Sequence, residues 1–170
     1  VAGEMVNAVK ETGWNNVAEA LQQSRQLLKD TLACNAEAVA RGIERVHDDQ
    51  TSILSYNDEN SLTCVLSIAY YFARNDYVVH RELPTGKGFA DLVFIPRKDV
   101  ESPALVVELK CDETADAAIS QIHRRKYPAK VLEHTGRMLL VGINYDRKTK
   151  THSCRIEAVE KLKNSLETPG

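Results

Sequence analysis

Val106-Val107-Glu108-Leu109-Lys110 is an apolar strand interrupted by two charges of opposite sign. Side chains alternate along a β-strand, so Glu108 and Lys110 are expected on one face and Val107 and Leu109 on the other. A charge inside a sheet is costly unless it is paired or holds a metal ion. The segment therefore predicts either a functional site on one face of a strand or a same-face Glu–Lys surface pair of small energetic value.

A second carboxylate stands at the start of the preceding apolar run. Asp91 follows a glycine-containing turn and opens the run 92–95, a hairpin distance before Glu108. If the two strands are neighbours, these carboxylates converge and offer hard oxygen ligands of the kind that suit Mg²⁺ or Mn²⁺. A lysine beside such an ion, here Lys110, can orient a water or help to deprotonate it.

Two polar residues on helical segments border the same region. Glu59 begins a helix whose apolar stripe includes Leu62 and Val65, and it lies at the edge of that stripe. Gln121 flanks the buried stripe of the helix that follows Lys110. The side chains of Glu59 and Gln121 are therefore expected to face the sheet.

Periodicity gives the order of the elements. Apolar residues at three- and four-residue steps predict helices, and short apolar runs bounded by Pro, Gly and polar residues predict strands. The expected helices are 14–29, 35–48, 57–74 and 115–126, and the expected strands are 77–82, 91–95, 104–110, 138–144 and 152–159. This order, α, α, α, β, β, β, α, β, β, predicts an α/β fold.

Composition limits the class of protein. The chain has 170 residues, a formal net charge of −2 and 43% hydrophobic residues, which excludes a polybasic nucleic-acid coat and an acidic disordered tail. The four cysteines lie far apart, without a zinc-knuckle or thioredoxin spacing, and predict reduced thiols in a cytoplasmic protein. We expect no membrane span and no signal peptide. The chain begins at Val1, and we expect it to be a piece of a longer protein.

Taken in order, the motifs resemble a known family. Glu59, Gly88-Phe89-Ala90-Asp91, Glu108-Leu109-Lys110 and Gln121-Ile122 are similar to the ordered motifs of the PD-(D/E)XK nuclease superfamily. The stretches 57–62, 81–93 and 139–145 resemble, more closely, the branch found C-terminal to an AAA-ATPase-like domain in bacterial proteins. The likeness covers roughly residues 14–158.

The resemblance implies a restriction-endonuclease-like core, in which a mixed central β-sheet is flanked by helices, here with an N-terminal helical extension. It implies Mg²⁺ or Mn²⁺ held by Asp91, Glu108 and the backbone carbonyl of Leu109. Glu59 would act on the metal directly or through water, Lys110 would position the attacking water, and Gln121 would orient that water or a phosphate. The implied reaction is the hydrolysis of phosphodiester bonds, with DNA as the expected substrate and RNA as the alternative.

Basic residues near these motifs are candidates for contact with nucleic acid. Lys87 lies between two glycines beside the expected site, and Arg124 and Arg125 follow Gln121. An ordinary solvated surface is the alternative interpretation of all three. Two departures from the family are visible: Ala90 stands where a Pro usually precedes the acid, and Arg125 occupies a position that is aromatic in the exonuclease branch. No phosphate-binding P-loop motif is present, so we expect no ATP hydrolysis.

The resemblance and the elements together predict three regions. Residues 1–52 form a helical extension or linker from a missing upstream domain, residues 53–160 the nuclease-like domain, and residues 161–170 a tail. The expected partners are nucleic acid, the AAA-ATPase-like domain of the parent chain and a second copy in a homodimer. Two alternatives to a nuclease stay open: a catalytically silent module that binds nucleic acid or a protein, and a regulatory domain of the missing ATPase.

Overall fold

A computed structural model describes residues 2–50, 59–81, 92–125 and 136–160, with side chains described for 16–49, 61–81, 92–125 and 136–160. The described helices are α1 (Ala2–Leu32), α2 (Ala36–Gln50), α3 (Glu59–Ala69), the 3₁₀ helix η1 (Tyr71–Asn75) and α4 (Ala115–Arg124). The described strands are β1 (Tyr77–Arg81), β2 (Leu92–Pro96), β3 (Ala104–Cys111), β4 (Arg137–Asp146) and β5 (Thr151–Glu160). The predicted order of elements is confirmed.

The strands form one mixed sheet in the order β1-β2-β3-β4-β5. Only β3 and β4 are parallel, and the other neighbouring pairs are antiparallel. A parallel connection needs a crossover, and α4 supplies it between β3 and β4. The strand that carries Glu108 and Lys110 is therefore central in the sheet, and all of its residues but Cys111 are buried.

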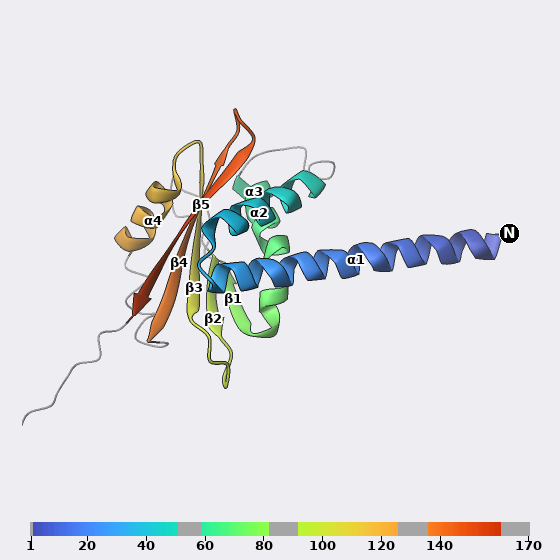
Figure 1. The fold of residues 1–170 in the computed structure, drawn as a ribbon, viewed down its shortest axis with the longest axis horizontal. Helices are drawn as coiled ribbons and strands as arrows, with labels where there is room; N and C mark the ends of the chain where they lie inside the picture. The colour runs from blue at the N-terminus through green and yellow to red at the C-terminus, as the bar shows by residue number, and fades with distance from the viewer. Residues whose placement is uncertain (1, 51–58, 82–91, 126–135, 161–170) are drawn as a thin grey trace, which may run out of the picture.

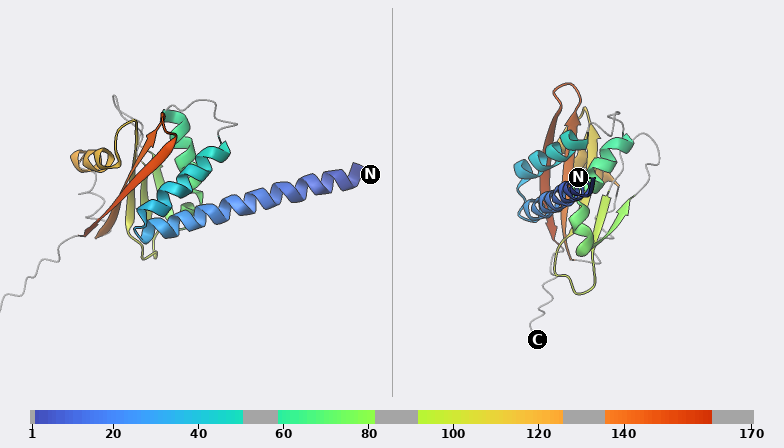
Figure 2. Two further views of the ribbon diagram at one scale, coloured as in Figure 1. Left: turned by 45° about the horizontal axis from the view of Figure 1, so that its top comes forward. Right: turned by 90° about the vertical axis from the view of Figure 1, so that its right-hand side faces the viewer.

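Helices cover both faces of the sheet. Figures 1 and 2 show α4 on one side and α1, α2 and α3 on the other, while the N-terminal part of α1 extends away from the sheet. The larger core lies under α1–α3 and includes Leu105, Val107 and Leu109 of β3. The smaller core lies under α4 and includes Val106 of β3 and Ile119 of α4. The predicted α/β fold, a mixed sheet flanked by helices and consistent with a restriction-endonuclease-like core, is confirmed.

Two helix boundaries differ from the sequence prediction. The first helix begins at Ala2 instead of 14, because a single glycine such as Gly13 costs a helix only about 1 kcal/mol and does not end it. The third helix stops at Ala69 and a 3₁₀ turn follows. The backbone N–H of Phe72 donates to the Oγ of Ser24 at 2.7 Å, so a contact with α1 replaces the helical hydrogen bond.

None of the described helices is long and apolar enough to cross a membrane.

Candidate functional site

Glu108 is the most unusual residue of the sheet. Its side chain is 0% exposed, and neither carboxylate oxygen has a hydrogen-bond partner in the described part of the chain. The alternation along β3 is as predicted, since Leu105, Val107 and Leu109 pack in the core under α1–α3. Glu108 consequently points to the face that α4 covers, where a charge is costly unless another group compensates it.

A glycine on the neighbouring strand lets α4 approach this face. Gly142 is the register partner of Glu108 across the parallel β3–β4 pair. A Cβ at Gly142 would lie 2.6 Å from the backbone oxygen of Ala115 and 2.9 Å from the Cγ1 of Ile119. Such distances leave no room for any side chain at Gly142, so the first turn of α4 lies directly over β4 beside Glu108.

Lys110 lies two residues further along the same face and is also buried, at 7% exposure. Its Nζ is 3.5 Å from the Oε1 of Glu113, whose side chain is half exposed. Its register partner on β4 is Asn144, and the Oδ1 of Asn144 accepts the backbone N–H of Glu113 at 3.0 Å. Asn144 thus fixes the backbone of Glu113, the residue that pairs with Lys110.

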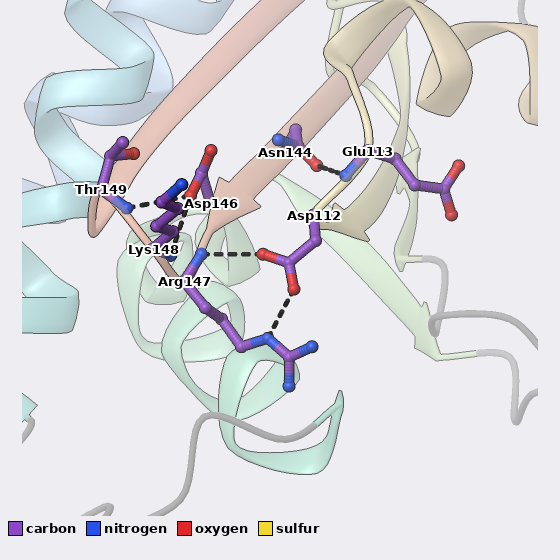
Figure 3. A network of polar contacts seen from close by, with 7 residues as sticks. All are labelled: Asp112, Glu113, Asn144, Asp146, Arg147, Lys148 and Thr149. Carbon is purple, nitrogen blue, oxygen red and sulfur yellow. Dashed lines mark hydrogen bonds and ion pairs between the residues drawn. The ribbon is translucent and has the colours of Figure 1, made fainter.

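The turn that leads from β3 to α4 is fixed to the hairpin between β4 and β5 (Figure 3). Asp112 has a positive φ of 56°, and its N–H donates to the carbonyl oxygen of Tyr145 at 2.8 Å. Its carboxylate accepts the backbone N–H of Arg147 at 2.8 Å and the Nε of the same residue at 2.7 Å. These hydrogen bonds, the backbone one first, hold the pKa of Asp112 below its usual value.

The C-terminal end of α4 lies close to Glu108. The Nη1 of Arg125 lies 4.0 Å from the Oε2 of Glu108, and the arginine side chain is 27% exposed. Gln121 is half-buried and precedes Arg125 by one helical turn, so the two share a side of α4. Arg124 is exposed. The structure therefore brings Glu108, Lys110 and Arg125 together and places Gln121 on the helix above them.

Several predicted site residues lie outside the described residues. Asp91 and Lys87 belong to the segment 82–91, and Glu59 is the first residue of α3, where its side chain is not described. Leu92, which follows Asp91, pairs with Val107, which precedes Glu108. The described parts of β2 and β3 are thus antiparallel neighbours, as expected for the two strands that carry the carboxylates.

One feature of the site fits a divalent cation. The fully buried carboxylate of Glu108 supplies hard oxygen atoms that accept no hydrogen bond from the described residues, and a divalent cation satisfies such atoms. Among the described residues, no group of three or more His, Cys, Asp and Glu side chains could hold a metal ion alone. Leu109, whose backbone carbonyl is a predicted ligand, pairs with Ile143 in the register.

Sequence reasoning missed the roles of Gly142, Asn144 and Glu113. A glycine inside an apolar strand commonly marks a close approach, so Gly142 did carry a readable signal. Asn144 lies two residues beyond Gly142 in the same strand, and thus on the same face. The pairing of Glu113 with Lys110 depends on the turn after β3, and nothing in the sequence pattern indicates it.

Comparison with known proteins agrees with this geometry. A family model described as the PD-(D/E)XK nuclease superfamily matches residues 57–154. The match is more than half of the chain and includes β1–β4, α4 and the start of β5. No curated protein matches the chain.

Proposed function

The chain belongs to the PD-(D/E)XK nuclease superfamily, and from this premise we propose that it is a metal-dependent nuclease domain that hydrolyses phosphodiester bonds. One observation carries the proposal: the carboxylate of Glu108 is fully buried on the α4 face of the central strand, without a hydrogen bond from the described residues. Lys110 lies on the same face. A buried acid beside a buried lysine, at the positions of the family's Glu-x-Lys motif, fits a catalytic site better than a packing role.

The site residues have separate roles in this proposal. Mg²⁺ or Mn²⁺, held by Glu108, Asp91 and the carbonyl of Leu109 with help from Glu59, would supply positive charge that activates water and offsets charge on the phosphodiester. The ammonium of Lys110 positions the attacking water, and its contact with Glu113 limits where the Nζ can point.

Residues of α4 and of the segment before β2 would bind the substrate. Gln121, on the half-buried side of α4, orients the water or a phosphate oxygen. Arg124, exposed on the same helix, and Lys87 add positive charge for the phosphate backbone.

We further propose that the substrate is DNA, that the domain spans residues 53–160 and that residues 1–52 connect it to an upstream AAA-ATPase-like domain. The same hypothesis includes a parent protein that is bacterial and cytoplasmic and that forms a homodimer. Its support is the motif resemblance of the stretches 57–62, 81–93 and 139–145. A protein containing both domains, examined by gel filtration alone and with DNA, tests the partner and the dimer.

Cleavage is tested directly on the purified chain. Linear, circular and single-stranded DNA and RNA are incubated with Mg²⁺, Mn²⁺ or EDTA, and we expect cleavage of DNA that EDTA abolishes. The Lys110→Ala variant should lose it. Lys148→Ala is the matched control, because Lys148 is exposed at the hairpin tip between β4 and β5. Equal cleavage by the Lys110→Ala variant would show that a contaminant is responsible.

The silent-module alternative predicts a different result. Binding of DNA with no cleavage under any of these conditions, together with no calorimetric signal for Mn²⁺, would favour it. Mn²⁺ binding that Glu108→Gln removes supports the metal-dependent enzyme.

A further inference from the structure

Among the described residues, Arg125 forms an ion pair with the buried carboxylate of Glu108. It is the C-cap residue of α4, and its backbone N–H donates to the carbonyl oxygen of Gln121 at 3.1 Å, which fixes its Cα at the end of the helix. Its Nη1 lies 4.0 Å from the Oε2 of Glu108. Its side chain is only partly buried, so the guanidinium can be reached from solvent as well as from Glu108.

The contact between Arg125 and Glu108 is a charge–charge interaction and not a hydrogen bond. A separation of 4.0 Å is longer than an N–H···O hydrogen bond, which ends near about 3.2 Å. Arginine that holds a carboxylate permanently usually donates two parallel hydrogen bonds. Neither oxygen of Glu108 accepts a hydrogen bond from the described residues, so the guanidinium of Arg125 offsets the charge without occupying these ligand positions.

We propose that Arg125 is the counter-ion of Glu108 only while no divalent cation is bound, and that cation binding releases its guanidinium to a phosphate of the nucleic acid. This inference rests on the proposed function. A dication at Glu108 repels a guanidinium 4.0 Å from the same carboxylate, and the planar fork of arginine matches a phosphate. The side chain can change its rotamer in this movement while the backbone of Arg125 stays capped on α4.

The exchange couples two binding events. Arg125 competes with the cation in the absence of nucleic acid and adds a phosphate contact in its presence. Cation binding must then raise the affinity for nucleic acid, and nucleic acid must raise the affinity for the cation by the same factor. The site would thereby hold its metal tightly only when a substrate is present.

Calorimetry with Mn²⁺ on the full chain tests the competition. Arg125→Gln is expected to bind Mn²⁺ at least about fivefold more tightly than the wild type, because no cation has to leave Glu108. Arg124→Gln is the matched control: it changes the net charge equally on the same helix but is exposed, and its dissociation constant should stay within about twofold. Arg125→Lys keeps the charge and should behave like the wild type.

Fluorescence anisotropy with a short DNA duplex tests the release. In a Lys110→Ala chain, which should not cleave, Mn²⁺ is expected to raise DNA affinity over its value in EDTA. Adding Arg125→Gln should reduce that gain at least about threefold. Adding Arg124→Gln should instead lower the affinity equally with Mn²⁺ and with EDTA.

The outcomes separate this inference from the proposed function. If the wild type binds Mn²⁺ but Arg125→Gln binds it equally or more weakly, the counter-ion inference is wrong and the nuclease proposal stands. If Arg125→Gln binds more tightly but leaves the Mn²⁺ gain intact, the release to phosphate is wrong. If the wild type binds no Mn²⁺, both proposals fail.

Discussion

Glu108→Met is expected to stabilise the protein when no metal is present. Methionine has a similar length and carries no charge, so the variant removes a fully buried carboxylate that accepts no hydrogen bond from the described residues. Leaving such a group unsatisfied costs about 1–3 kcal/mol. The lost attraction to Arg125 offsets part of the gain, by about 1 kcal/mol at most, because the arginine is partly exposed and can turn to solvent.

With the full offset subtracted, the expected net gain is up to about 2 kcal/mol in the free energy of unfolding. For a chain of 170 residues, each kcal/mol shifts the melting temperature by about 2–4 °C. Urea unfolding and calorimetry in EDTA measure both quantities. Glu160→Met is the control, because Glu160 is exposed on β5 and its replacement should change stability by no more than about 0.5 kcal/mol.

The same variant should lose the response to metal. Mn²⁺ at one hundred times its dissociation constant stabilises a folded protein by about 2.7 kcal/mol, and we expect this gain in the wild type but not in Glu108→Met. The reasoning is refuted if Glu108→Met is less stable than the wild type by 1 kcal/mol or more in EDTA, or if Mn²⁺ still stabilises it.

Three further changes test other parts of the structure. Gly142→Ala places a Cβ 2.6 Å from the backbone oxygen of Ala115 and should destabilise by about 1–3 kcal/mol in urea, whereas Gly42→Ala, which meets only a flexible leucine at 3.0 Å, should not. Burial lowers the pKa of His152 from 6.5 to about 4, so the unfolded state takes up the proton first, and the free energy of unfolding should fall by up to about 3 kcal/mol between pH 6.5 and pH 4. His152→Leu should flatten that fall, and an unchanged pH profile would contradict the assignment. Arg147→Ala removes the side-chain hydrogen bond but keeps the backbone N–H, so in an NMR titration it should raise the pKa of Asp112 only part of the way toward its usual value of 3.8. A pKa that does not change at all would show that the guanidinium of Arg147 does not contribute.

The sequence predicted the fold well because the elements are locally encoded. The strand containing Glu108 is a short apolar run, and the segment 115–126 shows a helical stripe, so period and order alone predicted an α/β arrangement. The break after Ala69 was missed because it depends on Ser24, a residue distant in sequence that captures the N–H of Phe72. Local periodicity carries no information about such a contact.

The candidate site was only partly predictable for the same reason. Alternation indicated that Glu108 and Lys110 share a face, because that relation is a property of a single strand. The approach of Arg125 to Glu108 joins a helix end to a strand, and it depends on how closely α4 packs on Gly142. The arginine was predicted to contact nucleic acid, and its ion pair with the buried acid emerged only from tertiary structure.

The ion pair also separates two explanations for a charge at position 108. A buried pair kept for the specificity of folding should be closely hydrogen-bonded, since an unsatisfied pair costs stability and fixes little. The 4.0 Å separation from Arg125 and the two open oxygens do not match that description. Packing does not require the charge either, because Val106 and Leu140 on the same face belong to an ordinary apolar core. Among the described residues, neither folding nor packing accounts for the carboxylate of Glu108, and the proposed cation rests on this observation.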